Sequence, residues 1–193
     1  MLGLIEKGRP VRFTLKNALK GARMYHTIKR EYGLPLYAHE KSPTEVAISL
    51  SKDPKAVSVG TLKESMKSFT SPRREYPPFR PVRPSQFESN PSFSPLLWKV
   101  LENHIHECPM FQSFGKAEAK STTFFSVYDF RNPPTYGRIP DVEDIFGTVR
   151  LDESGIVKNS FERNTMYRPA TTTGFIQLTD LLHEKLKAAC EAN

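Results

Sequence analysis

Residues 102–108, Glu-Asn-His-Ile-His-Glu-Cys, hold two of the five histidines and one of the two cysteines of the chain. Imidazole and thiolate groups are preferred zinc ligands, and a structural zinc site needs four of them while a catalytic one needs three. On a continuous helix, His104 and Cys108 lie one turn apart on one face, whereas His106 points away from them. Because leucines occupy the same face one and two turns earlier, the spacing predicts a packed helix with a half-buried His104 and Cys108. A metal site and a Cys/His catalytic pair are the alternatives.

A second group of candidate residues contains the carboxylates Asp141, Glu143 and Asp144. Such groups hold Mg²⁺ or share acid and base roles, but here they follow a proline, in what we expect to be the first turn of a helix, where the free N–H groups favour acids. The sequence also lacks the glycine-rich phosphate loops, the nucleophile elbow and the Cys-x-x-Cys motif. We therefore predict no catalytic residue, no metal ligand and no cofactor. The alternative is a metal-assisted enzyme that uses His104, Cys108 and Asp141 with Asp144.

The elements around these candidates predict an α+β fold, with a folded unit over residues 95–190. In chain order, the pattern predicts a helix over 95–107, a strand over 121–130, a β-hairpin over 146–163, a third strand over 165–168 and a final helix after Thr179. Pro109 is expected to stop the first helix. The prediction is a small unit in which a hairpin or three-stranded sheet packs with two helices, with Trp98 in its core.

The part of the chain before this unit looks different. Residues 34–70 predict short helices, because Ser42-Pro43-Thr44-Glu45 and Thr61-Leu62-Lys63-Glu64 have the pattern of capping boxes, for helices that end near Leu50 and Phe69. Residues 71–94 predict an extended Pro/Arg-rich linker, because prolines at this density neither continue a helix nor join a central strand. This linker would serve as an arm on RNA or protein, as an SH3 ligand, or as a plain spacer.

Charge and targeting patterns set the first residues apart. Residues 1–70 carry 13 Lys+Arg against 6 Asp+Glu, whereas residues 96–193 carry 11 against 13. Residues 1–33 predict a basic amphipathic helix, the pattern of a mitochondrial presequence, and Arg23-Met24-Tyr25 is similar to a matrix-peptidase site. We expect residence in the mitochondrial matrix, with the cytoplasm or nucleus as the alternative. No apolar run approaches the roughly 20 residues that a membrane span needs.

Together these patterns predict a non-enzymatic accessory or structural protein of a mitochondrial assembly, of the mitoribosomal or respiratory-complex kind, whose basic front half contacts RNA or a partner protein. No small-molecule substrate is evident from the motifs. The alternative outside the enzymes is a soluble protein-interaction or regulatory module outside mitochondria. The binding residues that we predict are Arg9, Arg12, Lys16, Lys20, Arg23, Arg73, Arg74, Arg80 and Arg83.

Overall fold

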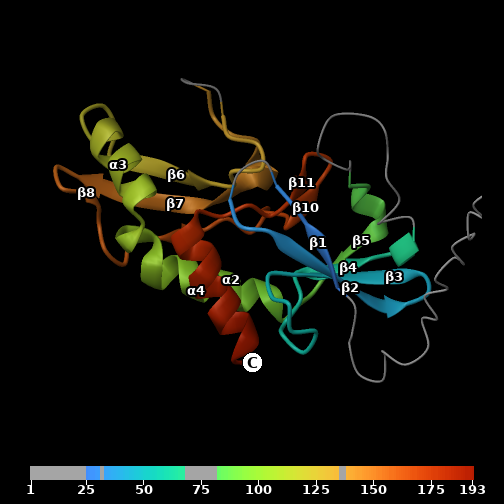
Figure 1. The fold of residues 1–193 in the computed structure, drawn as a ribbon. Coiled ribbons are helices and arrows are strands. Elements are labelled where there is room, and N and C mark those ends of the chain that lie inside the picture. The colour runs from blue at the N-terminus through green and yellow to red at the C-terminus, as the bar shows by residue number, and fades with distance from the viewer. Residues whose placement is uncertain (1–24, 31–32, 68–81, 135–137) are drawn as a thin grey trace, which may run out of the picture.

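A computed structural model describes residues 25–30, 33–67, 82–134 and 138–193 of the chain. It has mixed helices and antiparallel sheets, which confirms the predicted α+β class (Figure 1). A five-stranded sheet comes first in the chain, and a smaller sheet with the helices follows. Within the described ranges, no helix is long and apolar enough to cross a membrane.

The first sheet is built from residues that we predicted to be helical or linker. Its strands, in spatial order, are β1 (Tyr25–Ile28), β2 (Leu36–Ser42), β3 (Glu45–Ser49), β4 (Gly60–Leu62) and β5 (Phe87–Ser89). All neighbouring strands are antiparallel. The expected helices around 42–50 and 61–69 are therefore wrong for the residues that lie in β3 and β4.

The reason for the first error lies in the Ser42–Glu45 turn. The Ser42 hydroxyl accepts a hydrogen bond from the backbone N–H of Thr44 (3.3 Å), as a capping serine also bonds to a nearby N–H. Here the chain turns back at once and pairs Ser42 with Glu45. The alternation in β3, where Val46 and Ile48 are fully buried, favours a strand because the sheet buries these side chains in the core.

The ends of the predicted basic helix and linker are also part of the fold. Tyr25–Ile28 is an edge strand that pairs with β2, so the predicted helix over 1–33 does not extend through these residues. The rest of that prediction, up to residue 24, lies outside the described residues, as do residues 71–81 of the linker. Residues 84–89 form the short 3-10 helix η1 (Pro84–Gln86) and the edge strand β5, with prolines only outside the strand itself.

The second sheet confirms the predicted hairpin. It contains β6 (Phe124–Tyr128), β7 (Ile145–Asp152), β8 (Gly155–Ile156) and β9 (Glu162–Arg163), and the turn between β7 and β8 is the predicted Asp152–Gly155. The third strand is β9 rather than the expected residues 165–168. A separate two-stranded pair consists of β10 (Ala170–Thr171) and β11 (Gly174–Phe175).

Three helices accompany this sheet: α2 (Phe93–His104), α3 (Pro109–Glu118) and α4 (Asp180–Glu191). A 3-10 turn, η2 (Ile105–Glu107), follows α2, so the predicted helix over 95–107 is confirmed in outline, two residues early at its start. Pro109 does not only stop this helix. It occupies the first position of α3, where its missing N–H is not needed.

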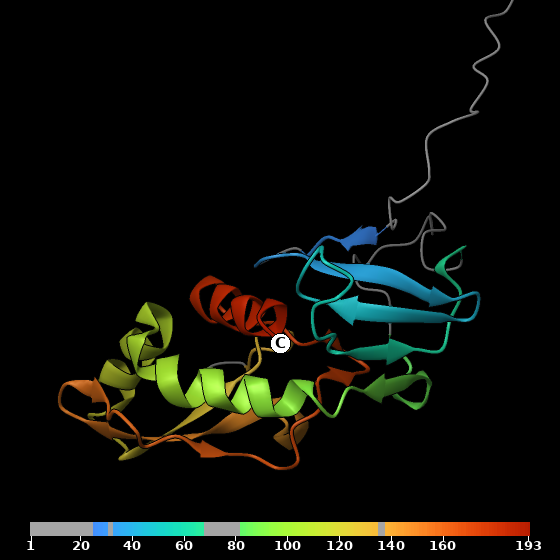
Figure 2. The ribbon, with the colours of Figure 1, turned by 90° about the horizontal axis from the view of Figure 1, so that it is seen from below.

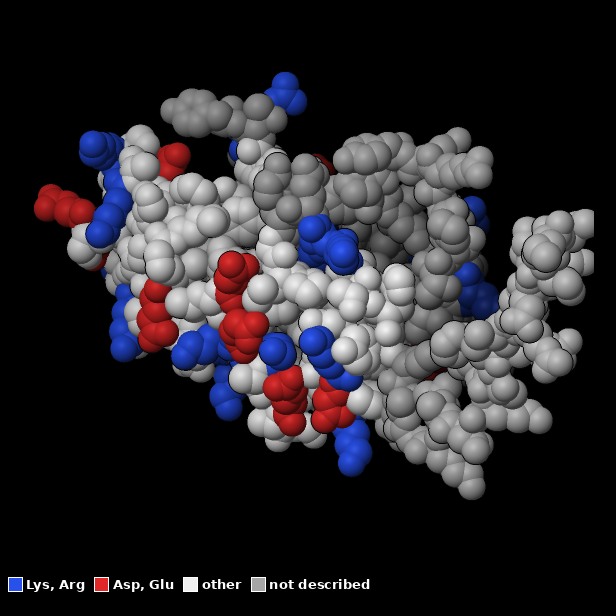
Figure 3. All heavy atoms as spheres, in the orientation of Figure 1, with Lys and Arg blue, Asp and Glu red and all other residues white. Residues whose placement is uncertain are grey.

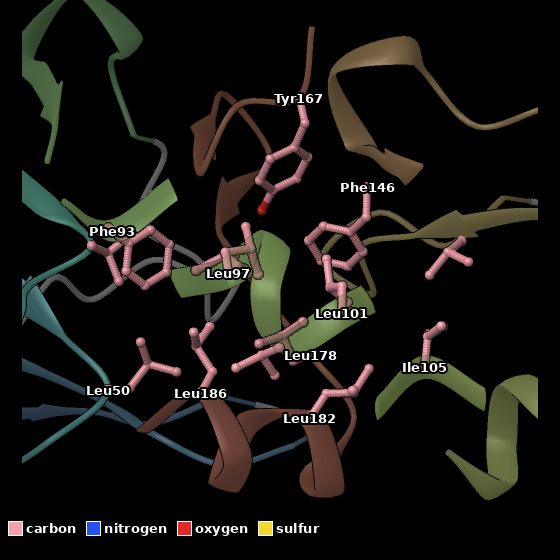
Figure 4. Close-up of a cluster of buried hydrophobic side chains, with 14 of the residues drawn as sticks. Leu50, Phe93, Leu97, Leu101, Ile105, Phe146, Tyr167, Leu178, Leu182 and Leu186 are labelled. Atoms are coloured by element: carbon pink, nitrogen blue, oxygen red, sulfur yellow. The ribbon is translucent and has the colours of Figure 1, made fainter. Parts of the chain in front are cut away.

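One large hydrophobic core joins the two sheets, beside a small cluster of Leu62, Val82 and Ala170. Figure 2 shows α2 lying over β6 and β7 while its first turn meets the five-stranded sheet. In Figure 4, Leu97 and Leu101 of α2 face Leu182 and Leu186 of α4, and all four are fully buried. The same cluster includes strand residues of the first sheet, such as Leu36 and Ile48 in β2 and β3. The described front half is therefore part of the packed body.

Candidate functional site

A polar cavity of about 480 Å³ lies against the first sheet. In β2, Leu36 and Ala38 are fully buried in the core. Because successive side chains of a strand point to opposite faces, His39, the next residue after Ala38, lies on the face away from that core. His39 pairs with Ala47, and Ala47 pairs with Thr61 on the next strand. These three residues form a row across β2, β3 and β4, and the small Ala47 leaves a hollow in its middle.

The wall beside this row comes from the loop between β3 and β4. The residues that line the cavity are His39, Glu40, Lys41, Ala47, Ser49, Pro54, Ala56, Ser58 and Thr61. Five of the nine are Ala, Ser or Thr, whereas the opposite face of the same strands carries Val46, Ile48 and Leu62. The cavity thus arises from small side chains on one face of the sheet, and its polar side chains are three hydroxyl groups together with His39, Glu40 and Lys41.

Hydrogen bonds hold this loop in place from two directions. The carbonyl of Ser51 can only accept, so His39 Nε2 donates to it (2.9 Å), and the Ser51 hydroxyl donates to Glu191 Oε1 (2.5 Å). The backbone N–H of Val57 donates to the carbonyl of Cys190 (2.9 Å). The end of α4 therefore fixes the loop that forms one wall of the cavity.

The second polar feature is a buried cluster that we name the Asp129 cluster, made of Asp129, Arg131, Asp144 and Tyr167. Asp129 Oδ1 accepts the backbone N–H groups of Arg131 (2.9 Å) and Gln177 (2.8 Å), and Oδ2 accepts the Tyr167 hydroxyl (2.9 Å). Arg131 Nε donates to Asp144 Oδ1 (2.7 Å). The cluster ties together the ends of β6 and of the 3-10 helix η3 (Val142–Asp144), the loop after β9 and the segment before α4.

Burial sets the protonation states in the Asp129 cluster. Loss of water raises the pKa of Asp129 and raises that of Tyr167 well above its usual value, so the tyrosine stays a hydrogen-bond donor at neutral pH. Burial also works against the charged Arg131, but Asp129 and Asp144 outweigh it and raise its pKa. Burial lowers the pKa of Arg30, at the end of β1, to about 10. Every Asp129 and Asp144 oxygen has a partner, which makes this cluster a structural brace.

The structure separates the predicted pair His104 and Cys108. The α-helix ends at His104, and Cys108 has extended backbone (φ −73°, ψ 114°), so the one-turn stacking of a continuous helix is lost. His104 Nδ1 contacts Glu107 Oε2 (2.8 Å), and this hydrogen bond lowers the pKa of Glu107. Cys108 is fully buried, 3.3 Å from the Thr179 hydroxyl. His104 is half-buried as predicted, with 27% of its side chain exposed, whereas Cys108 is more deeply buried than the predicted half.

Glu143 and Asp144 do fall in a helical turn, η3, and Asp141 is the residue that precedes its first position. They have different partners, however: Asp144 is buried against Arg131, and Glu143 pairs at the surface with Arg168 (3.3 Å). Within the described ranges, no group of three His, Cys, Asp or Glu side chains is placed to hold a metal ion.

The predicted binding residues are placed only in part. Arg83 is exposed and immediately precedes η1. The other eight, Arg9, Arg12, Lys16, Lys20, Arg23, Arg73, Arg74 and Arg80, lie outside the described residues.

Sequence reasoning missed the cavity altogether. The alternation of apolar residues at 36, 38, 46, 48 and 50 was the available signal for strands, and it would have placed His39 and Ala47 together. Comparison with protein-family models, with curated proteins and with solved structures found no match for this chain.

Proposed function

We propose that this protein is a non-enzymatic accessory or structural component of a mitochondrial assembly, and that its basic segments bind RNA or an acidic partner protein. The observation that carries the proposal is the separation of charge from the described body. Of 28 Lys+Arg and 21 Asp+Glu residues, the described ranges hold 19 and 18, which leaves nine basic and three acidic residues elsewhere. The body is close to neutral, and the excess positive charge belongs to residues 1–24 and 68–81.

The surface of the body is consistent with this division. On the face seen in Figure 3, Lys and Arg side chains alternate with Asp and Glu side chains. Mixed charge of this kind gives little attraction to a polyanion, whereas a concentrated basic segment gives much, because each phosphate contact releases a counterion. The contact with a polyanion is therefore assigned to the basic segments.

The mitochondrial part of the proposal rests on the basic pattern of residues 1–33 and on the predicted processing site before Tyr25. The first strand begins at Tyr25, the residue that follows the Arg23-Met24 dipeptide of the predicted processing site. Tyr25 pairs with His39 in β2 and packs edge-on against Tyr37, with ring centroids 5.4 Å apart. A chain that began at Tyr25 would therefore keep every strand that the structure describes.

Import is tested by fusing residues 1–35 to a fluorescent protein in cells with labelled mitochondria. The proposal requires a mitochondrial signal, and a diffuse cytosolic signal would contradict it. Sedimentation of the tagged full chain with and without RNase then distinguishes an RNA-containing assembly from a protein one.

The role of the basic segments is tested by a charge-matched comparison. One variant replaces Arg73, Arg74, Arg80 and Arg83 by Gln, and the control replaces four exposed lysines of the body, Lys99, Lys116, Lys120 and Lys158, by Gln. Both lose four positive charges. When the salt concentration is raised stepwise, we expect the first variant to dissociate from the assembly at a lower concentration than the unchanged protein does. The control variant should dissociate at the same concentration as the unchanged protein. Equal loss by both variants would mean that net charge, rather than the arginine segment, holds the protein there.

A further inference from the structure

The lining of the polar cavity against the first sheet includes two neighbouring residues of opposite charge, Glu40 and Lys41. Successive residues of a regular strand point to opposite faces, so only one of them would normally reach the cavity. The pairing of β2 with β3 shifts between Glu40 and Ser42, which makes Lys41 the extra residue of a β-bulge. A bulge changes the direction of the side chains around it, and both residues of this bulge belong to the lining of one cavity.

These two charges are available to a ligand. Both side chains are exposed, and within the part of the chain that the structure describes neither forms an ion pair. The lining as a whole is neutral, because the carboxylate and the ammonium group balance. A ligand that carried one charge would satisfy one group and repel the other.

The floor of the cavity adds small polar groups. The hydroxyl groups of Ser58 and Thr61 lie on the lining, where each can donate or accept a hydrogen bond. Ala47 and Ala56 leave the space between them open. A volume of about 480 Å³ lies in the range of small-molecule sites and is far from that of a macromolecular interface.

We propose that this cavity binds a small zwitterion of the α-amino-acid class, with its ammonium group on Glu40, its carboxylate on Lys41 and its side chain over Ala47. In such a molecule the two charges are neighbours, as Glu40 and Lys41 are neighbours on the bulge. The site is separate from the basic segments of the proposed function, and it would give the protein a small-molecule ligand that the sequence motifs did not indicate.

The test is calorimetric titration of the purified full chain with each of the twenty protein amino acids, up to about 10 mM. The N-acetyl derivative and the carboxamide of any amino acid that binds remove one charge each, and inorganic phosphate and glucose represent other ligand classes. We expect at least one amino acid to bind and both derivatives to bind at least tenfold more weakly. No binding by any amino acid, equal binding by the derivatives, or tighter binding of phosphate or glucose would overturn the proposal.

Variants locate the binding. Lys41→Gln and Glu40→Gln should each weaken it at least tenfold, and Ala47→Leu, which fills the hollow, should abolish it. The matched control is Lys52→Gln, because Lys52 lies over the Tyr37 ring (5.8 Å to the centroid) and does not line the cavity. A Lys52→Gln effect as large as that of Lys41→Gln would show attraction by general charge and refute the site. The two charge variants decide the matter even if Ala47→Leu fails to fold.

Discussion

The Asp129 cluster allows a quantitative prediction for Arg131→Met. The Arg131 side chain is 1% exposed and contacts Asp144 (2.6 Å) and Asp129 (3.6 Å). Methionine keeps most of the volume but removes the Arg131 charge from two buried carboxylates, of which Asp129 retains the more distant charge of Arg30. Removal of one partner of a buried ion pair costs about 3–5 kcal/mol, a large part of the roughly 5–15 kcal/mol that stabilises a typical domain.

The matched control is Arg168→Met. Arg168 pairs with Glu143 at 3.3 Å, but their side chains are 61% and 42% exposed. Exposed pairs contribute about 0–1 kcal/mol, so this variant should change the stability little. The backbone of Arg168 accepts a bond from Arg131 Nη2 (2.7 Å), which the substitution at Arg168 leaves in place.

Urea unfolding followed by circular dichroism measures both variants and a third, Arg131→Met with Asp144→Leu. The slope of free energy against urea should stay constant, so that the midpoint reports stability alone. We expect the third variant to recover part of the loss, because it removes one of the stranded carboxylates. If Arg131→Met costs no more than Arg168→Met, the cluster is not the brace that we describe.

Three further predictions address pH, backbone space and processing. Burial, followed by the charge of Arg30, lowers the pKa of His183 from 6.5 to about 4, so the folded state resists protonation. Above pH 6.5 the His183 side chain is neutral in both states and makes the free energy of unfolding no more pH-dependent. Between pH 6.5 and pH 4 the unfolded state binds the proton more readily, so the free energy of unfolding should fall by up to about 3 kcal/mol. Urea unfolding at pH 6.5 and at pH 4 should show a smaller fall for His183→Asn. Gly147→Ala would place a methyl group against the backbone oxygen of Glu162, and a lowered thermal midpoint of several degrees is expected, with an unchanged midpoint as the contrary result. Mass spectrometry of the protein from mitochondria should find an N-terminus at Tyr25, and a mature chain that begins beyond β1 would contradict the proposed processing.

The sequence predicted best where local pattern and tertiary burial agree. The hairpin turn Asp152–Gly155 needs a residue with positive φ, and Gly155 has φ 117°. Thr179 begins the last helix as expected, although its side chain makes no capping bond. In these two places, the structure that the local sequence pattern predicts is also the one that buries the neighbouring apolar residues.

Prediction failed where the same residues suit two structures. A Ser-Pro-Thr-Glu segment opens a helix or makes a hairpin turn, and only the burial of Ala38 before it and of Val46 after it decides between them. The cavity could be predicted only in part. The apolar alternation indicates that His39 and Ala47 share a face, but the place of Lys41 in the lining depends on a one-residue shift between β2 and β3, which no periodicity in the sequence records.

The attachment of the β3–β4 loop to α4 has a consequence for the order of folding. The Ser51–Glu191 bond joins residues 140 positions apart, and the Val57–Cys190 bond lies beside it. A chain that leaves a ribosome or a translocation channel with its N-terminus first presents Ser51 long before Glu191 is available. Strands β1 to β5 are consecutive neighbours and can pair as they emerge, but the β3–β4 loop is secured only after the last helix has formed, so completion of the first sheet is a late event.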